Sequence, residues 1–212
     1  TDVDTDNSAI TFSVSGSELS ITSAGVLTFA SAPDYETKTS YTATVTATDG
    51  TNSTTQSITV NVTNVNDNSP VFTSNATFSA AENQTSIGTV TATDGDASDS
   101  VTFTVSGSEL SITSAGVLTF ASAPDYETKS SYTATVTATD GTNSTDQSIT
   151  VTVTDVNESP AFTSSASFSA AENQTSIGSV SVSDPEDGSI TYSLSGTDAS
   201  SMAISSSGVL TF

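Results

Sequence analysis

The chain has 212 residues and a formal net charge of −22, set by 24 Asp and Glu against only two Lys. So many carboxylates repel phosphate backbones and anionic lipid, which argues against nucleic acid and membranes as partners and favours cations. The sequence has no His or Cys to serve as base or nucleophile, and no apolar run approaches the roughly 20 residues that span a bilayer, so we expect neither an enzyme nor a membrane-inserted protein.

The sequence repeats itself with a period of about 90 residues. Residues 14–38 recur letter for letter as residues 105–129, a shift of 91, and the block that begins at Phe72 returns from Phe162, a shift of 90. A fixed internal period of this size identifies a tandem array. Ser and Thr make up 83 residues, but Val, Ile and Phe alternate with them, so we expect a folded core rather than disorder.

Two linkers interrupt the strand pattern and mark the boundaries of the repeat, NVNDNSP ending at Pro70 and DVNESP ending at Pro160. We therefore predict a partial repeat at 1–69 that lacks its first two strands, a complete repeat at 70–159, and a partial repeat at 160–212 that lacks its last two strands. The segment ending in GVLTF occurs in all three copies, so joining the two ends in a polymer would duplicate it. We interpret the chain as a window from a longer array.

Within the complete copy, apolar and hydroxyl side chains alternate with the period of two that a half-buried strand requires. Bounded by turn signals, this pattern predicts strands near 75–80, 86–93, 100–106, 109–113, 116–120, 131–139 and 147–154. Seven short strands without helical periodicity predict an all-β fold, namely tandem seven-stranded antiparallel Greek-key, Ig-like sandwiches in a linear array. The predicted core consists of the inward-facing apolar residues Phe78, Ile87, Val90, Phe103, Val105, Leu110, Ile112, Val117, Leu118, Phe120, Val136, Ile149, Val151 and Val153.

The acidic residues gather at strand ends. Alternate loops of a sandwich lie at opposite ends, so the loop before the sixth strand of one copy should face the loops after the second and sixth strands of the next copy, across the linker. The residues that this arrangement brings to the first junction are Asp34, Glu36, Asn66, Asp67, Asn68, Asp94, Asp96 and Asp140.

Carboxylates that converge in this way require a cation. Two unit charges about 5 Å apart repel by about 0.8 kcal/mol in water, and by more in a drier cleft. Calcium takes about six to eight oxygen ligands from carboxylates, carbonyls and amides. We therefore predict several calcium ions at each inter-repeat junction, which would cancel the charge and join neighbouring repeats into a stiff rod.

At this point the motifs match a family. AAENQ, PDYE, NVNDNSP, the DGD pair and TATDG resemble, in order and spacing, the calcium motifs of cadherin repeats, in the shortened form found in large bacterial surface proteins. A single motif such as TATDG is weak, but the ordered set recurs at 90 to 91 residues and covers the whole chain. The resemblance implies a cadherin-like sandwich and an extracellular location at a bacterial cell surface.

The resemblance also implies further calcium ligands. Val65 and Asn68 would offer main-chain oxygens, and Asn66 and Asp67 their side chains. For the second junction it implies Glu82, Asp125, Glu127, Asn157, Glu158, Asp184 and Glu186, with Asp187 as an alternative to Glu186. The set is completed by Glu172 of the third copy and by Asp2, Asp4 and Asp49 of the first.

The two junctions differ in ways that should change how many ions they hold. The second linker is one residue shorter than the first and carries Glu158 in place of an Asp. The first copy contains no AAEN motif in this chain, so we expect its junction to bind fewer ions or to bind them more weakly.

Two functions fit these features. Near-identical repeats suit a calcium-rigidified extracellular stalk or spacer of a large bacterial surface adhesin or fibre, with calcium and neighbouring repeats as partners. The alternative is an adhesive module that binds polysaccharide, another cell-surface molecule or a second copy of itself. Tyr35 and Tyr126 are its candidate aromatic contacts, although their place beside the expected ligands also suits a role in shaping the site.

Overall fold

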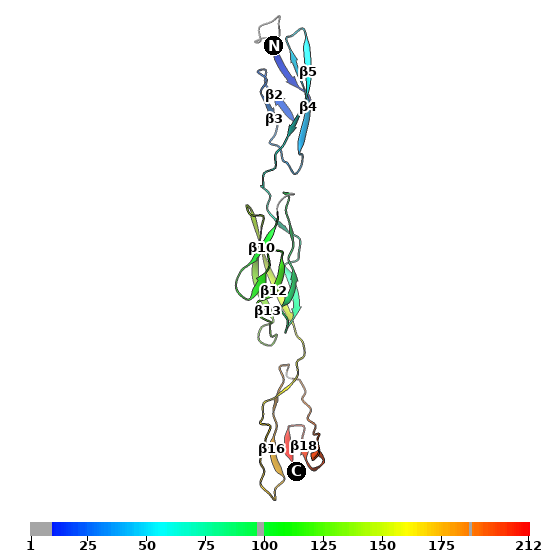
Figure 1. Cartoon of the computed structure of the whole chain (residues 1–212), viewed down its shortest axis with the longest axis vertical. Coiled ribbons are helices and arrows are strands. Elements are labelled where there is room, and N and C mark those ends of the chain that lie inside the picture. Colours follow the sequence, from blue (N-terminus) through cyan, green and yellow to red (C-terminus); the bar gives the residue numbers. More distant parts are fainter. Residues whose placement is uncertain (1–9, 97–99, 187) are drawn as a thin grey trace. The chain divides into compact units, whose positions relative to one another are not determined.

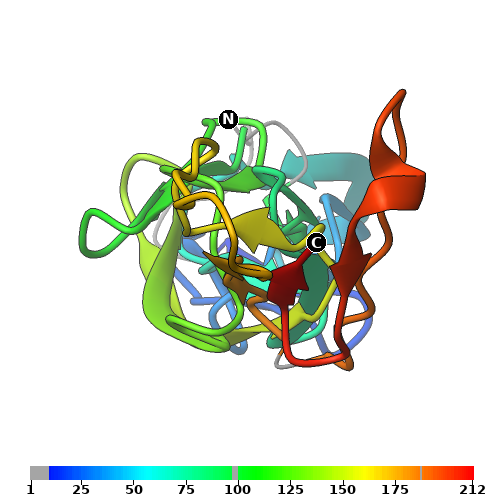
Figure 2. The same cartoon turned by 90° about the horizontal axis from the view of Figure 1, so that it is seen from below.

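A computed structural model describes residues 10–96, 100–186 and 188–212 of the chain. The elements in this part are β-strands apart from one 3₁₀ turn, η2 (Ala199–Ser201), orange-red in Figure 2. The predicted all-β class is confirmed. None of the described residues belongs to a helix with the length and apolar character needed to cross a membrane.

The chain packs into two compact units. Among the described residues, unit 1 comprises 10–73, 92–96, 100–102 and 138–145, and unit 2 comprises 74–91, 103–137, 146–186 and 188–212. The first linker therefore lies inside unit 1 and the second inside unit 2. Each unit joins its linker to the loops that come before and after it in sequence.

The sheets of unit 1 are small, and the longest pairing is the hairpin of β4 and β5, which lie side by side in Figure 1. Its register runs from Ser40 opposite Asn61 to Thr48 opposite Ser53, so hydroxyl side chains face one another across the two strands. The three sheets are β1 (Thr11–Val14)-β4 (Ser40–Thr48)-β5 (Ser53–Asn61), β2 (Leu19–Ile21)-β3 (Leu27–Phe29) and β6 (Val71–Phe72)-β9 (Ala92–Thr93).

The sheets of unit 2 are β11 (Leu110–Ile112)-β12 (Val117–Phe120)-β8 (Ser86–Thr89), β15 (Ala161–Phe162)-β17 (Val182–Ser183) and β16 (Ser176–Ser179)-β19 (Val209–Thr211)-β18 (Ala203–Ile204). A further sheet, whose residues lie mainly in unit 2, has the order β10 (Thr102–Val105)-β13 (Ser131–Thr139)-β14 (Ser144–Thr154)-β7 (Thr77–Ala81). The predicted strand at 131–139 is observed with the same bounds, whereas the one at 147–154 begins earlier, at Ser144.

The opening segment of the complete copy departs from the prediction in two ways. β6 pairs with β9, whereas β7 pairs with β14 and does so in parallel, with Thr150 opposite Thr77. The predicted strand at 86–93 is likewise divided between β8 and β9, which belong to different sheets. Side-chain alternation cannot predict that a strand changes sheets, because it does not show which neighbouring strand receives the backbone hydrogen bonds.

The core is concentrated in unit 2. Leu118, Val136 and Val151 are fully buried, as predicted, and the less expected Ala80 is buried with a relative exposure of 7%. Ala138, which belongs to unit 1, is 0% exposed. Val90, Phe103, Leu110, Phe120, Ile149 and Val153 are also buried as predicted, whereas Phe78, Ile87, Val105 and Ile112 are half-buried.

The placement of Val117 in the core was wrong. Its side chain is 45% exposed, whereas its neighbour Leu118 is 0% exposed. Consecutive residues of a strand point to opposite faces, so the two cannot both be buried in the same core.

This alternation predicts the cost of two neighbouring substitutions. Leu118→Ala should lower the free energy of unfolding by about 2–5 kcal/mol, because it leaves a cavity in a closed core. Val117→Ala, the matched control, should cost less than about 1 kcal/mol because its side chain is already in solvent. Urea unfolding at one fixed calcium concentration measures both, and equal losses would contradict the assignment of the two faces.

Candidate metal centres

Two loops with the sequence PDYET place acids beside the linkers. In unit 1, Asp34 Oδ1 accepts hydrogen bonds from the backbone N–H of Glu36 at 3.0 Å and of Thr37 at 3.1 Å, and Oδ2 accepts one from Thr37 Oγ1 at 2.9 Å. The Thr37 hydroxyl and these N–H groups lower the pKa of Asp34 from its ordinary value. In unit 2, Asp125 Oδ1 accepts the N–H of Thr128 at 3.0 Å. Both aspartates thus hold their own loops in shape.

The first acidic cluster, in unit 1, consists of Glu36, Asp67 and Asp96, each of which offers one carboxylate oxygen within 4.8 Å of the others. Glu36 comes from the loop before β4, Asp67 from the linker, and Asp96 from the loop after β9. The structure therefore brings together acids from three segments that lie far apart in sequence.

The loop after β9 carries carboxylate oxygens that are buried without a partner. Asp96 is 1% exposed; its Oδ2 accepts the Asn68 N–H at 2.9 Å, but its Oδ1 has no hydrogen-bond partner among the described residues. The same holds for Asp94 Oδ2, although Asp94 Oδ1 accepts the Asp96 N–H at 2.9 Å. A Cβ on Gly95 would lie 2.9 Å from Asn68 Cγ, so the linker approaches this loop at a point where only glycine leaves room.

The close carboxylates of the first acidic cluster make one another's ionised form less favourable. Burial raises the pKa of Glu36, and the neighbouring Asp96 and Asp34 raise it further. A buried polar atom without a partner costs free energy, and a buried charge costs more. The cluster therefore has the donor set and the electrostatic need that a hard cation would satisfy.

Asn143, which sequence reasoning missed, connects the first linker to Asp140. Its Nδ2 donates to Asn66 Oδ1 at 2.6 Å, to Asn68 O at 2.7 Å and to Asp140 Oδ2 at 3.3 Å. Burial raises the pKa of Asp140, but hydrogen bonds from the N–H groups of Asn143 and Thr142, at 2.7 and 2.6 Å, outweigh it, and the net pKa is lowered. The only sequence signal for Asn143 is its place three residues after Asp140 in the repeated TATDGTN.

The second acidic cluster, in unit 2, consists of two overlapping groups with Glu127 in common. The carboxylate oxygens of each group lie within 4.8 Å of one another, and the groups are Glu82, Glu127 and Glu158, and Glu127, Asp155 and Glu186. Asp155 was not among the predicted ligands. It opens the second linker, where the first linker has Asn64, so an acid at that position was visible in the sequence.

Glu82 is the buried member of this cluster and connects two of its segments. It is 3% exposed, and its two oxygens accept the backbone N–H of Tyr126 and of Val156, each at 2.8 Å. The carboxylate thereby ties the PDYET loop to the second linker. Tyr126 contributes through its backbone, which agrees with a role in shaping the site.

The second linker is not in the register that the sequence indicated. The Glu158 N–H donates to Glu186 Oε1 at 3.0 Å, which repeats the bond from the Asn68 N–H to Asp96 Oδ2 at 2.9 Å, and both pairs are 28 residues apart. Glu158 therefore occupies the place of Asn68 rather than that of Asp67. Glu186 takes the place of Asp96, whereas Asp187 lies outside the described residues.

Glu158 and Glu186 titrate as a pair. The adjacent Glu186 side chain raises the pKa of Glu158, whereas the Glu158 side chain and the Glu158 backbone N–H lower the pKa of Glu186. A hydrogen bond from its own backbone N–H lowers the pKa of Glu127, but burial and the charges of Glu82, Asp155 and Glu186 raise it overall. Glu158 Oε2 and Glu186 Oε2 are buried without a partner among the described residues.

The other predicted ligands lie as follows. Asp184 Oδ1 accepts the Glu186 N–H at 3.2 Å, and Asn157 Nδ2 donates to Glu158 O at 2.9 Å, so both lie beside the second acidic cluster. Val65 is 65% exposed and could act as a ligand only through its main-chain oxygen, because its side chain is a hydrocarbon. Glu172 is exposed. Asp2 and Asp4 lie outside the described residues.

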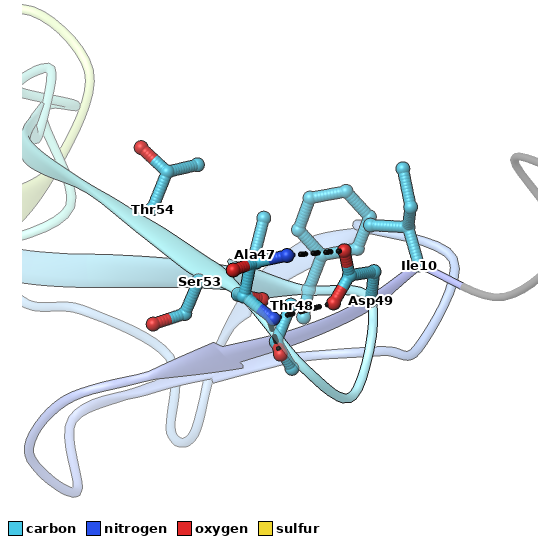
Figure 3. Close-up of a pocket in the computed structure, with 8 residues that line it drawn as sticks. Ile10, Ala47, Thr48, Asp49, Ser53 and Thr54 are labelled. Atoms are coloured by element: carbon cyan, nitrogen blue, oxygen red, sulfur yellow. Dashed lines mark hydrogen bonds between the residues drawn. The ribbon is translucent and has the colours of Figure 1, made fainter. Parts of the chain in front are cut away.

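Asp49 lies in a different setting from Asp140, its counterpart in the repeat. It borders a cavity of about 430 Å³ that is lined by Ile10, Phe12 and Ala47 and by hydroxyl and amide side chains of the β4–β5 turn (Figure 3). Its Oδ1 accepts the Asn52 N–H at 2.6 Å. No second acid lines this cavity among the described residues, so the cavity does not form a metal centre by itself.

The chain matches no protein-family model and no curated protein. It is similar to several solved structures. Over 99% of its length and 77% of theirs, it matches the EC22-24 repeats of mouse cadherin-23 with 25% identity and a TM-score of 0.67. The EC1-3 fragment of mouse protocadherin-24 gives 25% identity, coverage of 95% and 76%, and a TM-score of 0.66. The chain therefore has a cadherin-like β-sandwich fold.

A third solved structure, described as a cis-dimer of protocadherin gammaB7 EC3-6, has 27% identity and a TM-score of 0.65. The match covers 95% of this chain but 58% of the protocadherin fragment, so the chain spans a little over half the length of that relative. The likeness to cadherin extracellular domains supports an adhesion-related module.

The paired acids predict how the metal-free protein responds to pH. The pKa of Glu158 is raised on folding, so its contribution to stability is present below its ordinary value of 4.5 and is lost as the pH rises through the raised pKa. The lowered pKa of Glu186 acts in the opposite sense: its contribution is present above 4.5 and is lost as the pH falls through the lowered pKa. In a chelator, Glu158→Gln should therefore lose less stability than the wild type as the pH rises above 4.5.

Thermal melts in EDTA between about pH 4 and 7 measure this difference. The control is Asp146→Asn, which removes an exposed carboxylate outside both clusters and should follow the wild-type profile. If Glu158→Gln also followed the wild-type profile, the raised pKa of Glu158 would not matter for stability.

Proposed function

We propose that this chain is a segment of a calcium-rigidified extracellular stalk, a spacer in a large bacterial surface adhesin or fibre. The observation that carries the proposal is the set of buried carboxylate oxygens without partners, on Asp94, Asp96, Glu158 and Glu186, at both linkers. An acidic cluster alone is common on protein surfaces. Carboxylate oxygens that are both buried and unsatisfied need a cation, and these lie among loops that two copies and a linker share.

The residues present fit calcium. Each cluster supplies carboxylate oxygens, which suit a hard divalent ion. The first centre would be held by Glu36, Asp67 and Asp96, supported by Asp94, and the second by Glu82, Glu127, Asp155, Glu158 and Glu186. When bound, the ion supplies positive charge that lets these carboxylates stay close together.

The mechanical consequence follows from which segments carry the ligands. The linkers at 64–70 and 155–160 separate the proposed repeats at 1–69, 70–159 and 160–212. The loop before a linker, the linker itself and the loop after it would each bind the same ions, so the joint between two repeats would lose its freedom to bend. Many equivalent joints in series make a spacer, and a role of this kind needs no catalytic group.

Calcium binding can be tested one centre at a time. Calorimetric titration of the metal-free chain should show several ions binding to the wild type. Asp96→Asn should remove binding at the first centre only and Glu186→Gln at the second only, because each substitution deletes one buried charge. Saturating calcium should also raise the melting temperature, since a ligand at about 100 times its dissociation constant adds about 2.7 kcal/mol per site.

Asp146→Asn is the matched control for charge, because Asp146 belongs to neither cluster. It should leave the titration unchanged. Calcium heats in Asp96→Asn and Glu186→Gln that equal those of the wild type would remove the basis of the proposed centres.

Stiffening is tested by small-angle X-ray scattering. With calcium the maximum dimension of the 212-residue chain should be larger and its distance distribution sharper than in EDTA, because ligated joints cannot bend. The double variant Asp96→Asn with Glu186→Gln should give the EDTA profile even in calcium. A contour that does not respond to chelation would rule out the stalk while leaving calcium binding intact.

A further inference from the structure

The side-chain amide of Asn143 is surrounded by oxygen atoms. Besides Asn66 Oδ1, Asn68 O and Asp140 Oδ2, at 2.6, 2.7 and 3.3 Å, its Nδ2 has Asn66 O at 3.5 Å. A primary amide nitrogen carries two hydrogens, so four acceptors converge on two donors. Such a crowd of oxygens around one point is the environment of a bound cation rather than that of an ordinary amide.

Chemistry fixes which way the amide points in the metal-free protein. The reverse orientation would set Asn143 Oδ1 against four other oxygens, with no hydrogen between them. The turn between β13 and β14 also aims the residue, because the Asn143 N–H donates to Asp140 Oδ1 at 2.7 Å and the Thr139 hydroxyl donates to Asn143 O at 2.8 Å. The NH2 group is therefore held in the oxygen cage, defined here as Asn66 Oδ1, Asn68 O and Asp140 Oδ2.

The repeat contains its own comparison. Asn52 stands 91 residues earlier in an identical TATDGTNST segment, and Asp49 Oδ1 accepts the N–H groups of Thr51 and Asn52 at 2.7 and 2.6 Å, as Asp140 does in its turn. The Asn52 Nδ2, however, has only a long contact with Asp49 Oδ2, at 3.5 Å. The two turns are alike, so the linker oxygens account for the different setting of Asn143.

We propose that the amide of Asn143 is a built-in substitute for a cation at the first linker. Without metal it ties the linker to the β13–β14 turn through the oxygen cage. Asn66, Asn68 and Asp140 are also among the calcium ligands expected at the first junction, so an ion bound there would use the cage oxygens. The amide competes with that ion for these oxygens and so lowers the affinity of the site. The competition rests on the calcium binding proposed above, whereas the tie in the metal-free protein does not.

With this arrangement the linker has the same geometry with and without a bound ion. Oxygen atoms that face one another with no hydrogen or cation between them repel, but an amide NH2 has a partial positive charge and two hydrogens to offer them. The linker then keeps its main-chain path when the ion leaves. The cost falls on affinity, because the ion must displace an amide that is already hydrogen-bonded.

The test compares Asn143→Ala with Asn52→Ala, which removes the same group from the same turn away from the linker. In EDTA, hydrogen exchange of the backbone amides at 66–69 should be about tenfold faster in Asn143→Ala than in wild type, and unchanged in Asn52→Ala. Calcium titration is done in a Glu186→Gln background, in which only the first centre still binds calcium. Asn143→Ala should then bind calcium about three- to tenfold more tightly, which corresponds to the net free energy of about one hydrogen bond. Asn143→Ser, too short to span the cage, replaces the alanine variant if that one fails to fold.

The two readouts move in opposite directions, which a residue of merely structural importance would not produce. Weaker calcium binding in Asn143→Ala would make the amide oxygen a ligand, and unchanged binding would remove the competition; either result overturns that half of the proposal. Linker exchange that stays at the wild-type rate overturns the tie. If the wild-type chain binds no calcium, both the proposed stalk function and the competition between the amide and calcium are wrong. The exchange measurement still tests whether Asn143 ties the linker to the β13–β14 turn.

Discussion

The structure depends on negative charge that the chain cannot neutralise by itself. Its only two side-chain cations are already engaged: Lys38 pairs with Glu18 at 2.6 Å and lies over the ring of Tyr41, and Lys129 makes the same contacts with Glu109 and Tyr132. Neither reaches an acidic cluster, yet Asp96 and Glu82 are almost fully buried. Backbone N–H groups satisfy both oxygens of Glu82 but only one oxygen of Asp96, and an external cation would satisfy the other.

Backbone N–H groups do much of the positioning in both units. The Asn68 N–H holds Asp96, the Glu158 N–H holds Glu186, and the N–H groups of Tyr126 and Val156 hold Glu82. These bonds attach each linker to a buried acid through its main chain, so the path of the linker is fixed even where its side chains differ. The two linkers can therefore differ by one residue in length and still present the same bond, 28 residues apart, to the loop that follows.

Much of the fold could be read from the sequence, because strand alternation is a local property. The strand at 131–139 and most of the core were predicted from the alternation of apolar and polar residues alone. The error at Val117 arose because two consecutive apolar residues, Val117 and Leu118, were both placed in the core. The parallel pairing of β7 with β14 could not be read in this way, since it depends on which sheet a segment joins. Glu36, Asp67 and Asp96 were found by their place at strand ends and in the linker. The acids of the second cluster came only from the resemblance to cadherin motifs, which passed over Asp155 although it stands in a linker.

The sequence by itself determined the repeat, the all-β class, the excess of carboxylates and their gathering at strand ends, because each of these is set by local composition and period. Only the tertiary structure decided which oxygens are buried without a partner, that Glu158 stands in the place of Asn68, and that Asn143 but not Asn52 is enclosed by linker oxygens. Identical letters at 52 and 143 meet different neighbours, and burial and hydrogen bonding belong to the neighbours as much as to the residue.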